Sequence, residues 1–429
     1  MPTNPYDQLA YRCAPIEWSA PERLAVASLL HGGPRPRRDR YRVLELGCGN
    51  AANLIPLAYY RPHSEFVGVD GAHTQTALAQ SRCTELRLQN IRIHHADFLA
   101  ADAQLEGRFD YILVHGVLSW VDEATREALL AICSRRLAPG GLVYLNYNCR
   151  PGWNIRGMVR ELLMAQTADG GSLQQRALAA QEVSARMAEA YARHESPYCQ
   201  LLSNEFRVVC DHDAAYIAHE YLAEHNVAFW RSEFMALAAL HGLVHVADAD
   251  FNYESGRVPP GLPEQLAASG IHGRCPEDTL DLLVHRQLHS PILAHTPLVR
   301  RLPEPAELCD LVAASPLVRQ RGGKGKPVFV HPSTAEVEAR EPSMCKVLDQ
   351  MQKAWPRGER LGDLVPSSPA LLQDLLLLHR NGLIDLRRAA SEETDVDPQR
   401  LNAFEARFDD FQTSPYHFRE QATRALVPA

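Results

Sequence analysis

The segment that most constrains the fold is residues 41–54, YRVLELGCGNAANL, where an apolar run leads through two glycines into a helix-forming stretch. A buried strand followed by a Gly-x-Gly turn and a helix is typical of α/β domains that bind nucleotides, because glycines let a ligand approach the backbone closely. Gly47, Gly49 and Ala52 also fit the dinucleotide fingerprint. The glycines alone therefore leave several cofactors open.

Glu45 distinguishes between these cofactors. Strand alternation puts it at the carboxyl end of the strand, beside the helix N-terminus where a pyrophosphate would otherwise lie. A carboxylate there repels an anion and attracts a cation, and S-adenosylmethionine (SAM) carries two cationic groups and no phosphate. The segment thus favours SAM over NAD, with a glutamate that only supports a tight turn as the alternative. We expect Gly47, Cys48, Gly49 and Asn53 to line the same pocket, with Cys48 there for its small size rather than its reactivity.

The next two strands also end in acids. Residues 65–70, EFVGVD, place Asp70 about 20 residues after the glycine turn, the position from which a carboxylate binds ribose hydroxyls. A third strand at residues 91–95 leads to Asp97 and Phe98, where the acid can accept from the adenine amine and the ring can lie against the base. Each acid alone could be a helix cap. Three acids at successive strand ends are harder to explain in that way.

Strands and helices continue to alternate after this point. Residues 109–114 are expected to form a fourth strand, residues 123–137 a helix, and residues 142–148, LVYLNYN, a fifth strand after an Ala-Pro-Gly-Gly turn. This order predicts a parallel α/β sheet. The glycine turn, the three acids and the string LAPGG together resemble the class I SAM-dependent methyltransferases. That resemblance implies a Rossmann-like sheet of seven strands with SAM as the cofactor.

A narrower resemblance rests on residues 109–121, 146–162 and 215–251. These segments resemble the bacterial methyltransferases that carry a methyltransferase regulatory domain, a group that includes the protein lysine methyltransferases of outer membrane protein B in rickettsiae. The resemblance spans roughly residues 6–297 and implies a protein substrate. Where that group opens with Tyr-Asp-Glu-Val-Pro-Tyr, this chain has YDQLAY, so the fold carries over more directly than the substrate.

Composition sets outer limits on the function. The 429 residues are 46% hydrophobic and 22% charged, enough for a sizeable core and for two or three domains. We expect a cytoplasmic protein without a membrane span, because no long apolar run or signal-like leader is present. The 10 cysteines form no Cys-x-x-Cys pair, so we assign no metal. A net charge of -8 disfavours a nucleic acid partner held by its phosphates.

Four parts are expected along the chain. They are a SAM-binding core at residues 1–150, a helical insert at 151–230, the end of the core with the regulatory-domain segment at 231–297, and a C-terminal winged-helix-like domain and tail at 298–429. The insert is expected to act as a lid or dimerisation element, which leaves open whether the chain forms a homodimer. The leucine-rich helix at 369–381 favours burial by packing over lying in a DNA groove. The tail is expected to be helical at 398–411.

Methyl transfer to a lysine requires an uncharged amine. A lysine amine has a pKa near 10.4, so losing its proton at neutral pH costs about 4–5 kcal/mol, which burial or a nearby acceptor must offset. We take His115, Asn146 and Tyr147, at the ends of the fourth and fifth strands, as catalytic candidates, with His115 also at the cofactor. His115 could equally bond a backbone carbonyl. The fourth strand lacks the Asn-Pro-Pro-Tyr string of enzymes that methylate adenine or glutamine amides.

The substrate side is expected to be built from aromatic and polar side chains, because aromatic faces attract a methylated ammonium. The candidates are Tyr6, Tyr11, Trp120, Asn148, Trp153 and His219. His219 and its neighbour Glu220 could form an acid and base pair, and a buried polar pair is the alternative. Two other functions stay open: a small-molecule N- or O-methyltransferase, and a SAM-binding regulatory or scaffold protein without turnover.

Overall fold

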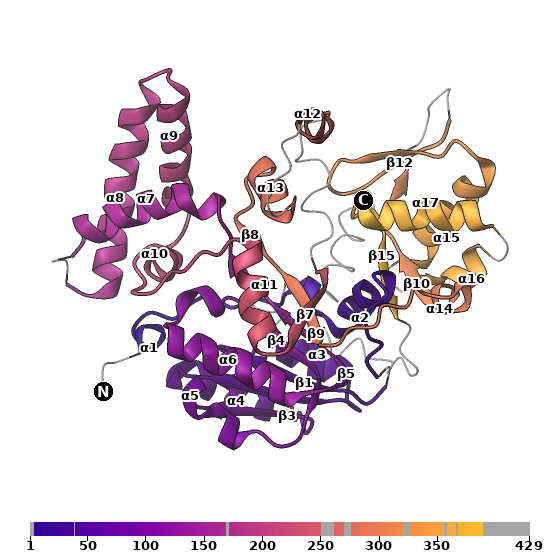
Figure 1. Ribbon diagram of the computed structural model, residues 1–429, viewed down its shortest axis with the longest axis horizontal. Helices are drawn as coiled ribbons and strands as arrows, with labels where there is room; N and C mark the ends of the chain where they lie inside the picture. Colours follow the sequence, from indigo (N-terminus) through magenta and orange to yellow (C-terminus); the bar gives the residue numbers. More distant parts are fainter. Residues whose placement is uncertain are drawn as a thin grey trace.

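The computed structural model describes residues 4–37, 39–168, 171–249, 261–269, 276–320, 326–355, 358–365 and 368–388. Figure 1 shows a central α/β core, a helical insert on one side of it and a C-terminal unit on the other. The helix predicted at 398–411 lies outside these residues. Among the helices of the described part, none has the length and apolar character needed to cross a bilayer.

The core is a seven-stranded sheet in the order β3-β2-β1-β4-β5-β9-β7. Its strands are β1 Arg42–Leu46, β2 Glu65–Asp70, β3 Ile91–His95, β4 Phe109–Val114, β5 Leu137–Leu145, β7 Leu243–Asp248 and β9 Pro291–His295. The first five run parallel, and β9 is antiparallel to both β5 and β7. The predicted sheet and its resumption after the insert are therefore confirmed.

Helices cover both faces of the sheet, and each face has its own hydrophobic core. One face is covered by α2 Pro21–Leu30, α3 Leu54–Tyr60 and α4 His73–Glu85, and the other by α5 Phe98–Ala101, α6 Glu123–Arg136 and α11 Arg231–Leu240. The strands between them are almost continuously apolar, as expected of a parallel sheet buried on both sides. The carboxyl ends of the parallel strands therefore meet along one edge of the sheet.

Strand β5 begins earlier than predicted. The Ala-Pro-Gly-Gly string was expected as a turn, yet it belongs to the strand, which starts at Leu137. Pairing with β4 shifts register there, because Phe109 faces Leu137 whereas Tyr111 faces Leu142. Gly140, at a φ of +77°, allows this irregularity.

The helical insert follows the short strand β6 Tyr147–Asn148, which pairs with β8 Leu288–His289. Its helices are α7 Gly152–Gln166, α8 Leu173–Ala192, α9 Pro197–Cys210 and α10 Ala214–Glu220. They enclose a separate core, against which Leu9 of the N-terminal segment packs. The helical insert predicted after the fifth strand is thus confirmed.

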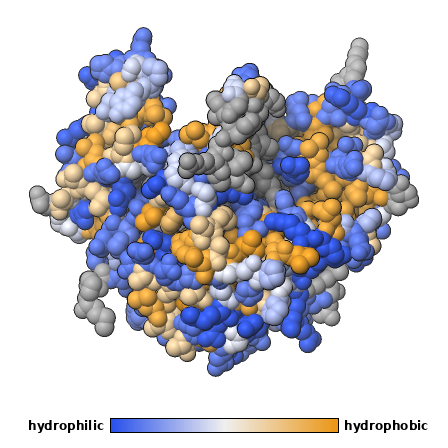
Figure 2. All heavy atoms as spheres, viewed as in Figure 1, coloured by the Kyte–Doolittle hydropathy of each residue, from blue (hydrophilic) through white to orange (hydrophobic). Residues whose placement is uncertain are grey.

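The insert also presents apolar side chains on its surface. On the face shown in Figure 2, hydrophobic residues are visible on the insert at the upper left and on the C-terminal unit at the right. Leu178 on α8 and Tyr198 and Leu201 on α9 are exposed. Nothing in the structure places a second copy on them, so the homodimer stays a prediction.

Two helices, α12 Leu262–Ala268 and α13 Pro276–Leu283, connect β7 to β8. The C-terminal unit then contains α14 Pro305–Cys309, β10 Leu311–Ala314, β11 Val318–Arg319, β12 Val328–Val330, β13 Glu336–Glu338, α15 Pro342–Ala354, β14 Glu359–Arg360, α16 Leu361–Leu364, α17 Pro369–Arg380 and β15 Asp385–Arg388. Helix α17 packs through Leu371 and Leu375 into the unit's own core. The strands β10 to β13 were not foreseen, and the winged-helix assignment stays a prediction.

Helix α2 joins the core to the C-terminal unit. Leu24 and Ala27 on it pack into the core of the sheet, whereas Val26 and Leu29 pack into the core of the C-terminal unit. Arg23 adds an ion pair at 3.0 Å to Asp385 at the start of β15. Helix α2 is therefore shared by two cores that lie far apart in the sequence.

Truncating Leu29 tests this joint. Leu29→Ala should lower the free energy of unfolding by about 2–5 kcal/mol, because the side chain is fully buried and its loss leaves a cavity. The matched control is Leu377→Ala on α17, which removes an exposed side chain and should cost less than about 0.5 kcal/mol. Urea unfolding followed by tryptophan fluorescence measures both. Equal losses of unfolding free energy in the two variants would contradict the role of α2 in joining the two cores.

Candidate functional site

The glycine turn between β1 and α3 has backbone that only glycine adopts easily. Gly47 and Gly49 have φ values of +81° and +52°. A Cβ on Gly47 would lie 2.3 Å from Val117, and one on Gly49 would lie 2.6 Å from the sulfur of Cys13. The turn therefore tolerates no side chain at these two positions.

Asp70 is held by the turn. Its Oδ2 accepts from the Gly49 amide at 2.8 Å, and its Oδ1 accepts from the Ala72 amide at 2.8 Å. Burial raises the pKa of Asp70, and the two amide bonds oppose that rise. The carboxylate is thereby fixed at the carboxyl end of β2, beside the turn, where the sequence predicted a ribose contact.

Glu45 is buried under the same turn. Its Oε1 accepts from the Asn53 side chain at 2.9 Å, while its Oε2 has no hydrogen-bond partner among the described residues. Burial raises the pKa of Glu45 to about 8; the Asn53 bond lowers it and the neighbouring Asp70 carboxylate raises it further. A buried carboxyl oxygen without a partner is costly. A cationic ligand such as the SAM ammonium would satisfy it.

Cys48 lies in the turn with its sulfur against Gly68 of β2. A Cβ on Gly68 would lie 2.8 Å from that sulfur, so the pair fits only with a small residue on each side. Burial raises the pKa of the Cys48 thiol well above its ordinary value, which keeps it protonated. This environment suits the structural role expected of Cys48.

The segment before α2 covers the turn. The Asn4 amide donates to the carbonyl of Gly71, which follows Asp70, at 2.9 Å. The Ile16 amide donates to Asn53 Oδ1 at 2.9 Å. Sequence reasoning placed a cover only in the helical insert and missed this one, because an irregular segment has no periodicity to reveal its contacts.

Asp97 and Phe98 follow β3 as predicted but differ in their surroundings. Asp97 is exposed and caps α5, accepting from the Leu99 amide at 2.8 Å. Phe98 is half-buried, with its ring edge 3.8 Å from the position that a Cβ on Gly47 would occupy. The ring thus lies next to the glycine turn, where it can lie against a flat ligand group.

His115 follows β4 and takes part in a chain of side-chain hydrogen bonds. Its Nδ1 lies 2.7 Å from the Tyr144 hydroxyl and 3.1 Å from the Asn146 amide nitrogen. Trp18 Nε1 donates to the Tyr144 oxygen at 2.9 Å, so the Tyr144 proton can point to His115. Burial lowers the pKa of His115 to about 4, and the ring is therefore neutral at pH 7. Trp18 and Tyr144 were not predicted.

Asn146 is brought together with His115, whereas Tyr147 is not. Asn146 Oδ1 accepts from the Gly116 amide at 2.6 Å, which turns its amide nitrogen toward the His115 ring. Tyr147 points to the opposite face of the sheet and packs on Phe234, with ring centroids 4.1 Å apart. Tyr147 therefore lies in the hydrophobic core rather than with the other two catalytic candidates.

Trp120, Asn148 and Trp153 lie where β4 and β6 end. Trp120 and Trp153 meet edge to face at 5.6 Å, and the guanidinium of Arg156 lies over the Trp153 ring at 5.6 Å. The backbone amide of Asn148 donates to Ser119 Oγ at 2.8 Å. The side-chain nitrogen of Asn148 is buried without a hydrogen-bond partner in the described part of the chain. Arg156, missed in the sequence, connects these residues to helix α10.

Tyr6, Tyr11 and His219 form one aromatic group. The Tyr6 and His219 rings stack at 4.2 Å, and Tyr11 meets His219 edge-on at 5.8 Å. His219 Nε2 bonds the Leu9 carbonyl at 2.7 Å, and the Tyr11 hydroxyl donates to Glu220 at 3.4 Å. The structure therefore joins the N-terminal segment to α10 through substrate candidates that are about 200 residues apart in sequence.

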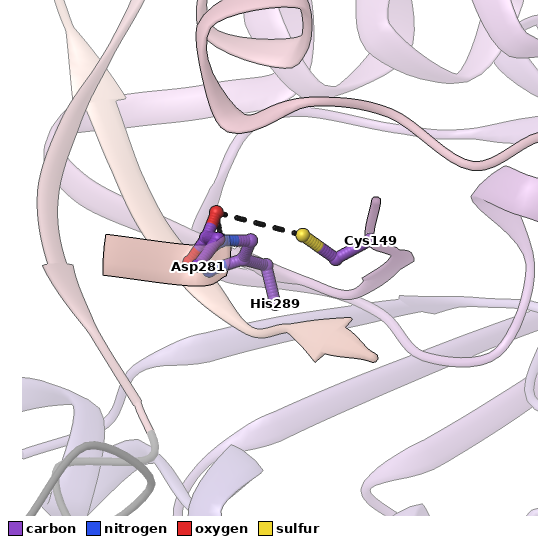
Figure 3. A group of neighbouring side chains, drawn as sticks. All are labelled: Cys149, Asp281 and His289. Atoms are coloured by element: carbon purple, nitrogen blue, oxygen red, sulfur yellow. Dashed lines mark hydrogen bonds and ion pairs between the residues drawn. The ribbon is translucent and has the colours of Figure 1, made fainter. Parts of the chain in front are cut away.

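A second polar cluster lies behind β6, where Figure 3 shows Cys149, Asp281 and His289 pointing toward one another. Asp281 Oδ2 lies 2.7 Å from His289 Nε2 and 3.5 Å from the Cys149 sulfur. Two ligands of one tetrahedral zinc ion would lie about 3.4 Å apart, so the shorter contact indicates a hydrogen bond. Asp281 also pairs with the buried Arg286 at 2.9 Å. The cluster is a charge-balanced network that ties α13 to β6 and β8.

Comparison with known families agrees with this geometry. Residues 43–141 match a methyltransferase domain, and residues 213–295 match a predicted methyltransferase regulatory domain. The first contains the glycine turn, Asp70, Asp97 and His115, and the second contains His219 and the strands β7 and β9. These matches confirm the resemblance seen in the sequence.

Individual relatives give a consistent picture. An uncharacterised protein of Rickettsia prowazekii is 31% identical over 296 residues, which are 69% of this chain and 53% of that protein, so the chain spans about half its length. A second uncharacterised protein of the same organism is 27% identical over 233 residues, covering 54% of this chain and 93% of its own.

A solved structure, PKMT2 from Rickettsia typhi in complex with AdoHcy, superposes with a TM-score of 0.77. It is 22% identical, and the match covers 93% of this chain and 82% of that one. At that identity the likeness shows the fold, and the covered share is too large to be the α/β core alone.

The Glu45 carboxyl predicts a pH effect. Between its ordinary pKa of 4.5 and about 8, the folded state binds the proton more tightly than the unfolded state, so the stability of the ligand-free protein should fall as pH rises through this range. Glu45→Gln removes this titration. The melting temperature of the variant minus that of the natural protein should therefore increase from pH 5 to pH 8, and the variant should bind SAM more weakly. Calorimetry measures both. The control is Glu65→Gln, which changes an exposed carboxyl group at the start of β2. A difference in melting temperature between Glu45→Gln and the natural protein that shrinks as pH rises would contradict the assignment.

Removing the Asp281 charge should destabilise the fold. Asp281→Asn leaves the Arg286 guanidinium buried without its counter-charge, and we expect a loss of about 3–5 kcal/mol in the free energy of unfolding. The exposed pair of Asp310 and Arg360 provides the control, since Asp310→Asn should cost at most about 1 kcal/mol. Urea unfolding with and without EDTA measures this. A marked EDTA effect on the natural protein would argue for a bound metal instead.

Proposed function

We propose that this chain, which carries a methyltransferase domain with SAM as its cofactor, transfers the SAM methyl group to a lysine amine of a protein substrate. The observation that carries the methyl-donor site is the buried, unpaired Oε2 of Glu45 beside the glycine turn. A cationic cofactor favours the ionised form of this carboxyl group and gains an interaction with it, whereas a phosphate-bearing cofactor would oppose that ionisation.

The residues around the turn fit the parts of SAM. Glu45 would hold the ammonium, Asp70 the ribose hydroxyls, and Phe98 with Asp97 the adenine ring and its amine. The backbone of Gly47, Cys48 and Gly49 would allow close approach, while Asn53 orients the Glu45 carboxyl and His115 closes the far end. SAM supplies a methyl group already activated by its positive sulfur, so the protein has to position the acceptor and exclude water.

The N-terminal segment supports that second task. Cys13 lies against Gly49, and Trp18 bonds Tyr144 beside His115, so side chains from residues 4–20 contact both the glycine turn and the surroundings of His115. The neutral His115 is suited to donate or accept a hydrogen bond, and Asn146 fixes its ring. We therefore assign His115 and Asn146 to orienting the reacting groups.

A lysine acceptor is supported by the side chains beyond the pocket. Tyr6, Tyr11, Trp120 and Trp153 provide aromatic faces that attract an ammonium, and Glu220 provides a carboxylate. The sequence resemblance to the regulatory-domain methyltransferases, which include protein lysine methyltransferases, points to the same acceptor. The structural likeness to PKMT2 is consistent with it at the level of the fold.

Labelling identifies the acceptor. Lysate from cells that lack the protein is incubated with SAM carrying a radiolabelled methyl group and with the natural protein or Asp70→Ala. We expect label in one or a few protein bands, recovered as methylated lysine after acid hydrolysis. Asp70→Ala should bind SAM at least about 30-fold more weakly, a loss of ~2 kcal/mol, and transfer no label.

The other outcomes separate the remaining functions. Label in a small extractable product would identify a small-molecule methyltransferase, and SAM binding without transfer in any fraction would identify a regulatory or scaffold protein. Asp211→Ala, at the exposed end of α9, controls for effects of losing an acid elsewhere. Unchanged SAM affinity in Asp70→Ala would remove the cofactor assignment itself.

A further inference from the structure

The end of helix α10 carries an unusual arrangement of buried polar groups, which we call the α10 cluster. It consists of Tyr6, Tyr11, Arg156, Tyr216 and Glu220. The two N-terminal tyrosines come from the segment that covers the cofactor turn, and Arg156 comes from α7. Three parts of the chain therefore meet around one carboxylate.

His219 lies next to the α10 cluster, and its role differs from that of Glu220. His219 is buried, stacks on Tyr6 and uses Nε2 to bond the Leu9 carbonyl, so its ring serves to hold the N-terminal segment. Burial also lowers its pKa, which keeps it neutral. Glu220 is half-buried and is bonded by the Tyr11 hydroxyl at the long distance of 3.4 Å. Glu220 is therefore the group that can exchange its partner for a ligand.

The charges around Glu220 are only partly balanced. Arg156 bonds Tyr216 and lies 3.7 Å from the Glu205 carboxylate. Burial raises the pKa of Glu220 to about 7, with Arg156 and the Tyr11 bond opposing the rise. The Tyr221 hydroxyl is buried without a hydrogen-bond partner in the described part of the chain, whereas Arg156 Nε and Glu205 Oε2 have no hydrogen bond there beyond their 3.7 Å ion pair. Unsatisfied polar atoms of this kind point to a polar ligand.

The cluster lies next to the cofactor turn. Burial raises the pKa of the Tyr6 hydroxyl, and the carboxylates of Glu220 and Asp70 add to the rise, so both carboxylates are near enough to act on this hydroxyl. Asn4, two residues earlier, bonds the carbonyl of Gly71. A group that reaches Glu220 past Tyr6 is therefore close to the ligand held by Asp70.

We propose that the Glu220 carboxylate binds the ammonium of the acceptor lysine and takes its proton, beside the rings of Tyr6 and Tyr11. This inference rests on the proposed function. An N–H bond of the ammonium breaks, an O–H bond forms on Glu220, and the electron pair left on nitrogen becomes available for attack on the methyl group. Glu220 then returns the proton to solvent. A carboxyl group that titrates near neutral pH suits this exchange.

Several titratable groups face Glu220 and bear on its pH dependence. They are Tyr6 and Tyr11 from the N-terminal segment, Arg156 from α7, Glu205 from α9, and Tyr216, His219 and Tyr221 on or next to α10. Burial raises the pKa of each tyrosine and lowers that of His219, while Arg156 and Glu205 form an ion pair with each other. Glu220 is thus the group expected to titrate near pH 7.

The deciding experiment follows the Glu220 carboxyl band by infrared difference spectroscopy, natural protein minus Glu220→Gln, across pH. The probes are N-acetyl-lysine methylamide and its uncharged analogue N-acetyl-norleucine methylamide. The lysine probe should lower the pKa of Glu220, because its ammonium stabilises the carboxylate, and the norleucine probe should leave it unchanged. A band that the lysine probe does not move overturns the proposal.

Rate measurements give a second readout with poly-L-lysine as the methyl acceptor. Glu220→Gln should slow transfer by about 10²- to 10⁴-fold at pH 7 and recover as pH approaches the pKa of lysine itself. A slowed rate that stays low at high pH indicates a structural role and counts against the proposal. The matched control is the exposed Glu224→Gln, which should behave like the natural protein.

SAM calorimetry separates the two levels of inference. Glu220→Gln should bind SAM as tightly as the natural protein, because Glu220 bonds none of the residues around the cofactor turn in the described part of the chain. Failure of the natural protein to bind SAM contradicts the proposed function. SAM binding together with an unresponsive Glu220 band leaves that function intact and overturns only the role of Glu220.

Discussion

The hydrogen bond between Asn53 and Glu45 is the interaction on which the rest of the site depends. It keeps one oxygen of a fully buried carboxyl satisfied at the end of β1, and so leaves the other oxygen for a ligand. The same Asn53 side chain accepts a hydrogen bond from the Ile16 backbone amide and donates one to the Ser19 hydroxyl. One amide thus sets the direction of the carboxyl and fastens the N-terminal segment over the turn.

This arrangement couples ligand binding to stability. Burying a carboxyl without full compensation costs free energy, which the ligand-free protein lowers by holding a proton on Glu45 near neutral pH. A cation arriving at Oε2 would favour the charged form and remove that cost. The N-terminal segment, tied to Asn53, would be stabilised by the same event. We infer that the cofactor contributes to the ordering of the cover as well as filling the pocket.

The sequence predicts the core because its signals are local. The glycine turn, the acids after β2 and β3 and the alternating elements each lie within a few residues of the feature they determine. The contacts of residues 4–20 with the glycine turn, and those of Arg156, were not predicted, because the residues they join are distant in sequence and no periodic pattern reveals such contacts. Tyr147 lies apart from His115 because the two-residue period that continues from β5 puts Tyr144 and Asn146 on one side and Tyr147 on the other. The same period puts Tyr144 on the side of His115.

The acceptor side differs from the cofactor side in how it is assembled. The cofactor turn belongs to one continuous β-α unit, whereas the α10 cluster needs the N-terminal segment, α7 and α10 to meet. Leu9 packs into the core of the insert, and its carbonyl holds His219. Movement of the insert would therefore displace Tyr6 and Tyr11 together with Glu220. The acceptor site can therefore move with the insert while the glycine turn, Glu45 and Asp70 keep their geometry.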